Sequence, residues 1–451
     1  MSKFVKLSDT FAKVIDYRGK TPKKLGGDWS KNGYRALSAL NIKTTGLVGL
    51  DSVKYVDENL YKRWMKEEIE EGDILLTSEA PAGQVIVWDS DEKIVLSQRL
   101  FALRLNKYFN NYFIKYFIQS DLGQKEILKN TTGSTVFGIS AKMFDLISIP
   151  NININIQNRI ASSLKSLDDK IELNNRINAE LEAMAKTLYD YWFVQFDFPD
   201  ENGNPYKSSG GKMVYSEELK REIPEGWEVK RIGDIINPLE SGKRPKGGID
   251  KTLKDGIPSL GAECIDKLGV FNYSSTRYIP YSYKEKITSG VIKDNDILIY
   301  KDGAYVGKTT LFRDNFPFSY AVVNEHVFLM RAKKKEMQEY LLLTLMQNYY
   351  FNIMQSLAQK AAQPGLNQED LKSIIIIVPN DYITNKFNCI TVTMFKNLFS
   401  LANENQQLAS LRDWLLPMLM NGQVGFKETT HKEEIIKSQQ KKQHLELLLS
   451  Q

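Results

Sequence analysis

Basic and polar residues gather in loops at matching places of the two halves of this 451-residue chain. The first half contains Arg18, Lys20, Thr21, Lys23, Lys24, Gln84, Gln98, Arg99, Ser134 and Thr135. The second half contains Lys243, Arg244, Lys246, Lys301, Tyr305, Lys308, Asn324, His326, Lys360 and Gln363. Lysine and arginine neutralise phosphates, whereas arginine, asparagine and glutamine form paired hydrogen bonds with base edges. One such loop is usually a solvated turn, but recurrence in both halves favours DNA contacts.

Residues that support catalysis are scarce in this chain. The three histidines are His326, His431 and His444, and the two cysteines, Cys264 and Cys389, lack the spacing of zinc ligands. No Gly-x-Ser-x-Gly elbow presents a nucleophilic serine. We therefore expect no metal site. Two cysteines form no disulfide framework, and this indicates a reducing cytosol.

The segment Gly303–Thr309 is similar to a phosphate-binding P-loop but is one residue short between its glycines. A P-loop must also lead from a strand into a helix, so that backbone N–H groups face the phosphates. The residues that follow, Thr309–Phe312, have the pattern of a strand. The segment therefore predicts the loop of a β-hairpin.

The elements that must position these loops occur twice, at an offset of about 223–229 residues. Three segments of the first half, Gly19–Lys23, Glu71–Leu76 and Leu146–Pro150, return as Gly242–Lys246, Asp294–Ile299 and Ile375–Pro379. Repeats of this length indicate two domains, because the periods of solenoids are tens of residues. Each copy predicts short strands (74–77, 84–88 and 94–105; 297–300, 309–312 and 320–330). Each also predicts a helix, at about 111–129 and 335–359, and Asn367 is the expected N-cap of a further helix.

Each copy ends in a long helix whose apolar residues alternate in steps of four and three, as in coiled coils. In the first helix the stripe contains Ile160, Leu164, Leu167, Ile171, Asn174, Asn178, Leu181, Ala185 and Leu188. In the second it contains Phe387, Thr391, Met394, Leu398, Leu401, Asn405, Leu408, Arg412 and Leu415. Asn178 and Asn405 fall at matching positions. They either fix the register from buried sites or lie at a solvated edge.

These patterns divide the chain into domains at 1–150 and 226–380, long helices at 151–194 and 381–421, a connector at 195–225 and a polar tail at 422–451. The tail has no counterpart in the repeat. The net charge of +5 permits nucleic-acid binding without requiring it. The amino terminus has no apolar signal core, and no stretch is long and apolar enough to span a membrane.

Three local segments, Leu188–Pro199, Ile223–Trp227 and Leu411–Pro417, complete a resemblance to the specificity subunits of Type I restriction–modification systems. The resemblance extends to about Val424. It implies an α+β fold in which two target-recognition domains each read half of a split, asymmetric DNA site. Two long antiparallel coiled-coil helices would separate these domains in a pseudo-two-fold arrangement. A helix of about 38 residues spans roughly 57 Å, against roughly 34–36 Å between half-sites one helical turn apart.

The same resemblance implies the partners of the chain. They are double-stranded DNA, two adenine-methylating modification subunits and two ATP-driven translocase–nuclease subunits, in the cytoplasm. The partners would use S-adenosylmethionine, ATP and magnesium, while this chain would bind no cofactor and catalyse no reaction. The absence of an [DN]-Pro-Pro-[YF] methylation motif agrees with this. Two other functions stay open at this point: a self-contained DNA methyltransferase or nuclease, and a coiled-coil scaffold that binds proteins.

Overall fold

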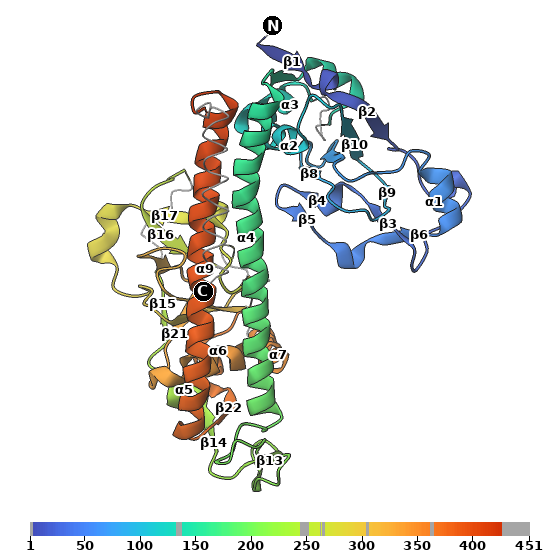
Figure 1. Ribbon diagram of the computed structural model, residues 1–451. Coiled ribbons are helices and arrows are strands. Elements are labelled where there is room, and N and C mark those ends of the chain that lie inside the picture. Colours follow the sequence, from blue (N-terminus) through green and yellow to red (C-terminus); the bar gives the residue numbers. More distant parts are fainter. Residues whose placement is uncertain are drawn as a thin grey trace, which may run out of the picture. The chain divides into compact units, whose positions relative to one another are not determined.

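The structure is a computed structural model that describes residues 3–131, 138–243, 252–261, 263, 267–303, 306–360 and 365–425. It divides into two units, which are described separately: residues 1–169 with 408–451, and residues 170–407. Each unit combines small sheets with helices (Figure 1). No helix within the described ranges is long and apolar enough to cross a membrane.

The first unit is built on a four-stranded antiparallel sheet. Its strand order is β2 (Phe11–Asp16), β10 (Leu100–Leu105), β7 (Ile74–Thr77) and β8 (Val85–Val87). Because side chains alternate along a strand, Phe101 and Leu103 of β10 enter one hydrophobic core and Leu100 and Ala102 enter another. The central strands are therefore buried on both faces, and the loops at their ends carry the exposed polar residues.

Smaller elements complete this unit. A three-stranded sheet has the order β6 (Lys54–Val56), β3 (Tyr34–Leu37), β9 (Val95–Leu96). The other pairs are β1 (Phe4–Lys6) with β11 (Ser148–Pro150) and β4 (Ile42–Lys43) with β5 (Gly46–Leu47), and the short helix is α1 (Glu58–Trp64).

The second unit repeats this topology. Its four-stranded sheet has the order β15 (Glu240–Ser241), β21 (Val327–Met330), β18 (Asp296–Tyr300), β19 (Thr309–Phe312). Its three-stranded sheet has the order β17 (Arg277–Ile279), β16 (Ile257–Leu260), β20 (Val322–Val323). In both three-stranded sheets one pair is parallel, β3 with β9 and β16 with β20. The duplication read from the sequence is thus a duplication of strand order and direction.

The remaining elements of the second unit frame these sheets. They are the hairpin β12 (Met213–Ser216) and β13 (Arg221–Pro224), the pair β14 (Glu228–Arg231) and β22 (Ile375–Val378), and helices α5 (Ile232–Ile235) and α8 (Gln368–Ser373). The side chain of Asn367 accepts a hydrogen bond from the N–H of Asp370, as expected of an N-cap. The predicted connector therefore carries a hairpin of its own.

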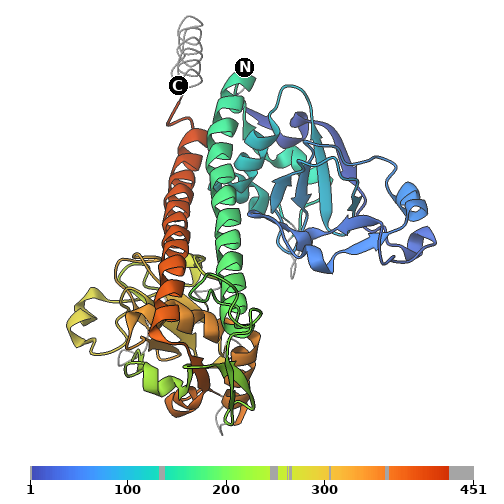
Figure 2. The same ribbon diagram turned by 60° about the horizontal axis from the view of Figure 1, so that its bottom comes forward.

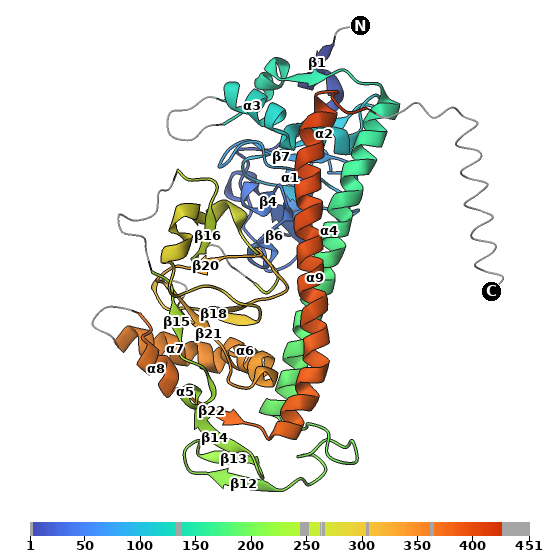
Figure 3. The same cartoon turned by 90° about the vertical axis from the view of Figure 1, so that its left-hand side faces the viewer.

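Two predicted helices are each broken in the structure, so the prediction of single helices was wrong. The first is α2 (Asn111–Gln119) and α3 (Asp121–Lys129), and the second is α6 (Gln338–Met346) and α7 (Asn348–Lys360). The breaks fall at Ser120 and Gln347, both with extended backbone. The Ser120 side chain caps α3 by accepting from the N–H of Gly123. Each break lets both halves pack on the core; α6 lies between the sheet and the long helices of its unit (Figure 3).

Two predicted strands are also each divided, into β9 and β10 in the first copy and into β20 and β21 in the second. The halves belong to different sheets, and a turn joins them. In the first copy Arg99 takes the left-handed conformation, with φ of 63°. This turn presents the side chain immediately before β10.

An arginine–aspartate pair joins the two central strands in each copy. Nε and Nη2 of Arg104 donate to the two carboxylate oxygens of Asp73, at 3.0 and 2.9 Å. Arg331 donates to Asp296 in the same way, with Nη2 at 2.6 Å from Oδ2. Burial raises the pKa of Asp296, although the Arg331 guanidinium acts against this. Both aspartates are almost fully buried, so each carboxylate has its arginine as a charged partner inside the sheet.

The long helices are α4 (Ile154–Tyr189) and α9 (Asp381–Met420), which run side by side (Figure 2). In the second unit they are antiparallel, because Tyr189 lies against Phe387 while Asn174 donates from Nδ2 to Asn405 Oδ1 at 2.9 Å. Every residue of the two predicted stripes is buried or half-buried. Asn178 is buried, whereas Asn405 is half-buried and contacts Asn174 rather than its sequence counterpart. The α+β fold class with repeated domains and two long helices is confirmed.

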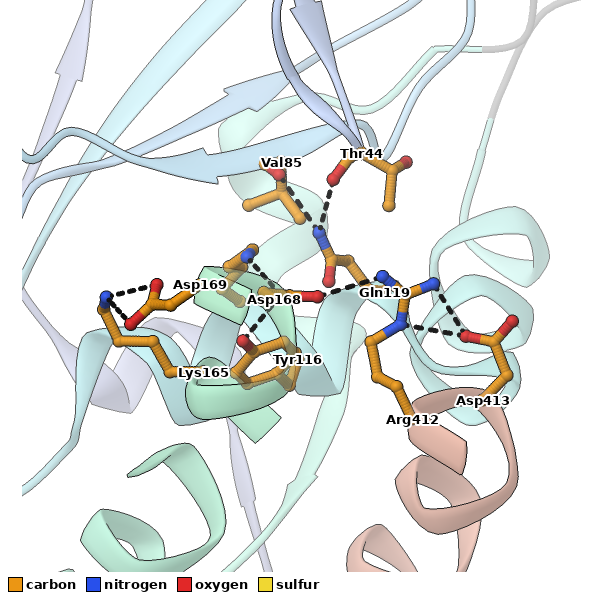
Figure 4. Close-up of polar contacts among 10 residues, drawn as sticks. Thr44, Val85, Tyr116, Gln119, Lys165, Asp168, Asp169, Arg412 and Asp413 are labelled. Atoms are coloured by element: carbon orange, nitrogen blue, oxygen red, sulfur yellow. Dashed lines mark hydrogen bonds and ion pairs between the residues drawn. The ribbon is translucent and has the colours of Figure 1, made fainter. Parts of the chain in front are cut away.

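In the first unit, Asp168 of α4 connects both long helices to α2 (Figure 4). Its carboxylate accepts from Tyr116 at 2.7 Å, from Arg412 Nη1 at 2.9 Å and from Lys115 Nζ at 3.2 Å. Burial opposes the charge, but these three partners together lower the pKa of Asp168. The equivalent positions of the second unit, at an offset of 227, are apolar: Leu342, Leu343, Phe395 and Ala185.

Candidate nucleic-acid interface

In the first copy, a cation–carboxylate pair lies where the loops after β7 and before β10 meet. The guanidinium of Arg99 lies 2.8 Å from the carboxylate of Glu79, measured from Nε to Oε1. The backbone N–H of Ser78 donates to the Arg99 carbonyl at 2.8 Å, and the N–H of Ile139 donates to the Ser78 carbonyl at 2.9 Å. Three separate segments are thereby held together at one end of the sheet.

This meeting point is hollowed into a pocket of about 330 Å³, lined by Arg18, Gly19, Ser78, Glu79, Gln98, Arg99, Gly138 and Ile139. The structure thus brings together three of the predicted residues, Arg18, Gln98 and Arg99. The side chains of Arg99 and Glu79 are 50% and 34% exposed. An incoming ligand can therefore reach both groups.

The second copy has the same construction with different side chains. His326 precedes β21 and Asp302 follows β18, and Nδ1 of His326 lies 2.8 Å from Asp302 Oδ2. The N–H of Lys301 donates to the His326 carbonyl at 3.1 Å, and the N–H of Leu366 donates to the Lys301 carbonyl at 2.7 Å. These backbone bonds match those of Ser78 and Ile139 in the first copy. The pairs Glu79–Arg99 and Asp302–His326 are therefore equivalent, and we call them the paired sites.

Arg18 shapes the wall of the first paired site. Its Nε and Nη2 donate to Asp16 at 2.9 and 2.8 Å, and its Nη1 donates to the Ile139 carbonyl at 3.2 Å. Its guanidinium also lies 3.8 Å from the ring centroid of Phe101. In the second copy the ammonium of Lys301 lies 5.0 Å from the ring of Phe328, the equivalent phenylalanine. Both cations thus pack on the sheet beside a paired site.

In the glycine–lysine loop of the first copy, residues 19–24, some side chains form hydrogen bonds within the domain and others are exposed. The Lys20 ammonium donates to the Trp64 carbonyl at 3.0 Å, and burial followed by repulsion from Lys66 lowers the pKa of Lys20. Thr21 Oγ1 accepts from the N–H of Lys24, whose own ammonium donates to the Gly19 carbonyl. Lys23 is exposed, and so is Lys243 in the second copy.

Other predicted residues stabilise loops. Gln84 Oε1 accepts from the N–H and the hydroxyl of Thr44, at 2.9 and 2.8 Å, and Asn324 Oδ1 accepts from the N–H of His326 at 2.9 Å. Lys308 is half-buried directly before β19. The predictions for Ser134, Thr135, Arg244, Lys246, Tyr305 and Gln363, and for the side chain of Lys360, lie outside the described residues.

The predicted hairpin at the P-loop-like segment is confirmed. Strands β18 and β19 pair antiparallel, with Ile299 opposite Thr309, so the segment leads into a strand rather than a helix. The described residues contain no group of three or more histidine, cysteine or acidic side chains placed to hold a metal ion.

Sequence reasoning missed the carboxylates of the paired sites, Glu79 and Asp302, and also Glu325. Candidates for DNA contacts were sought among cationic and amide side chains, because the phosphates of DNA repel carboxylates. A signal was nevertheless present, because the offset of 223 that aligns β7 with β18 also aligns Glu79 with Asp302. The sequence does not show which cation each carboxylate pairs with, because Arg99 and His326 lie in the turns before β10 and β21.

The chain is similar to known proteins over most of its length. A family model described as the Type I restriction modification DNA specificity domain matches residues 2–183 and 224–411. The MjaIX specificity subunit of a Type I restriction enzyme from Methanocaldococcus jannaschii is 26% identical over an alignment of 377 residues, which covers 79% of this chain and 78% of that subunit. The HindI specificity subunit from Haemophilus influenzae is 25% identical over 438 residues, covering 80% of this chain and 88% of that subunit.

A solved structure shares the fold. The crystal structure of the Type I restriction–modification S subunit from M. genitalium superposes with a TM-score of 0.57 and 17% identity, over 95% of this chain and 96% of that one. The two matched segments of the family model together make up most of this chain. The chain therefore belongs to the family of Type I restriction–modification DNA specificity subunits.

Proposed function

We propose that this chain reads a bipartite, asymmetric DNA site, with one target-recognition domain on each half. The observation that carries the proposal is the pair of equivalent sites, Glu79–Arg99 and Asp302–His326. The backbone bonds around them match, whereas the side chains differ. Two copies with one framework and different reading groups suit two half-sites of different sequence.

The partners belong to the same proposal. The chain docks two adenine methyltransferase subunits and, through them, two translocase–nuclease subunits, in the cytoplasm where its DNA substrate lies. It binds neither S-adenosylmethionine nor ATP and supplies no catalytic group. The names of its relatives support this, since the MjaIX and HindI proteins are both specificity subunits of restriction enzymes.

Sequencing of genomic adenine methylation in strains with and without the gene tests the proposal. We expect a methylated motif made of two short defined segments around a spacer of unspecified bases, lost when the gene is deleted. Methylation of a single continuous motif would contradict the proposal. Methylation by the purified chain alone would instead support a self-contained methyltransferase.

A further inference from the structure

The two paired sites differ in how their cation responds to pH. The guanidinium of Arg99 is charged at every pH at which a protein is folded. Histidine, in contrast, changes its charge between about pH 5 and 8. The two sites are otherwise alike in exposure, because the His326 and Asp302 side chains are 40% and 37% exposed. One copy therefore has a permanent cation where the other has a titratable one.

Two carboxylates lie against the ring of His326. Its Nδ1 lies 2.8 Å from Asp302 Oδ2, and its Nε2 lies 3.1 Å from Glu325 Oε1. An ionised carboxylate can only accept hydrogen bonds, and a neutral imidazole has one N–H. Both contacts are hydrogen bonds only when both ring nitrogens carry a proton. One of these carboxylates comes from the loop after β18 and the other from the turn before β21.

The carboxylate in each pair indicates a base edge rather than a phosphate as the target. A phosphate near Arg99 would also approach the negative charge of Glu79, which repels it. A base edge in the major groove presents acceptors and donors side by side, as in the O6 and N7 of guanine and the amino group of cytosine. Arginine suits the guanine acceptors and a carboxylate suits the cytosine amino group. A neighbouring cation and carboxylate complement such an edge.

We propose that each paired site reads one base pair of its half-site, and that reading by the second copy alone depends on pH. This inference rests on the proposed function. The free protein holds each cation against its own carboxylate, and both groups turn to the DNA in the complex. A histidine loses its positive charge as the pH rises whereas an arginine keeps it, so the second site can lose a charged donor that the first site retains.

The test uses the chain in complex with its modification subunit and DNA carrying the site found by methylation sequencing. Binding is measured against DNA with each single base-pair change, at about pH 6 and about pH 8.5. At the higher pH we expect discrimination at one position of the second half-site to fall roughly 5- to 150-fold, the range of one good bidentate contact. Discrimination in the first half-site should hold. This measurement needs no variant, so it cannot be confounded by misfolding.

Reciprocal substitutions sharpen the test. His326→Arg should abolish the pH dependence of the second half-site, and Arg99→His should introduce it in the first. Equal pH dependence in both halves, unchanged by these substitutions, would overturn the pH assignment. A uniform loss of affinity in Arg99→Ala, with unchanged base preference, would identify a phosphate contact and overturn the base-reading assignment. If the complex selects no bipartite site at all, the proposed function fails instead, which separates the two results.

Discussion

At the scale of single residues, Asp168 shows how one carboxylate can hold three elements together. Replacing it with asparagine removes the anion that Lys115 contacts and one of the two carboxylates that contact Arg412, which keeps its pair with Asp413. We expect a loss of about 1–3 kcal/mol in the free energy of unfolding at neutral pH, the usual range for a broken charged network. Thermal and denaturant unfolding of the chain would measure it. The matched control is Asp169→Asn, because Asp169 is 54% exposed and its ion pair with Lys165 contributes at most about 0.5 kcal/mol.

The pH dependence of this loss follows from the sign of the shift. The folded-state pKa of Asp168 is lower than its ordinary value, so its contribution is complete above the ordinary pKa of 3.8 and disappears as pH falls through the lowered value. The difference in stability between the wild type and Asp168→Asn should therefore shrink below about pH 4. If the difference in the free energy of unfolding stayed the same in acid, the asparagine would act through altered packing rather than through the lost charge.

At the scale of elements, the break between α2 and α3 depends on a close approach at Gly123. A Cβ atom at this position would lie 2.0 Å from the carbonyl oxygen of Phe117. Gly123→Ala should therefore destabilise the chain by about 1–3 kcal/mol, although alanine favours helices, because the backbone must move. Unfolding curves give the value, with Gly425→Ala as the control, since no atom of the described residues that the new side chain could meet lies within 4 Å of its Cβ position. A stabilised Gly123→Ala variant would contradict this account of the break.

The long helices permit a second prediction at this scale. Helix α4 has 36 residues, which corresponds to roughly 54 Å at the usual rise. If its length sets the spacing of the half-sites, insertion of one heptad within 160–188 keeps the stripe in phase and should change the preferred spacing or abolish binding. The bases read should stay the same. Selection from DNA libraries with variable spacers measures this, and an unchanged spacing would show that another feature sets the distance.

Some elements of this fold could be predicted from the sequence and others could not. The repeat, the central strands and the stripes of α4 and α9 follow from local periodicity and were predictable. The breaks at Ser120 and Gln347 were not, because neither residue excludes a helix and tertiary packing decides the outcome. The pairing of Glu79 with Arg99 was missed for a related reason. It depends on how two distant loops meet at the end of the sheet.

At the scale of the whole molecule, the central claim is that two copies read two half-sites independently. The variant Lys243→Ala, Arg244→Ala, Lys246→Ala tests it, since it alters only the segment of the second copy, Gly242–Lys246, that repeats Gly19–Lys23. Lys243 is exposed, whereas Arg244 and Lys246 lie outside the described residues and are included because the sequence repeat predicts them as DNA contacts. If these residues contact phosphates, affinity should fall with little change in base preference, whereas base contacts would relax one half-site.

The most direct measurement is the sequence of the methylated motif in cells that carry this variant in place of the wild-type gene. The two-reader account predicts that the half of the motif read by the first copy stays unchanged, while methylation becomes weaker overall or less selective in the other half. Simultaneous relaxation of both halves would contradict it.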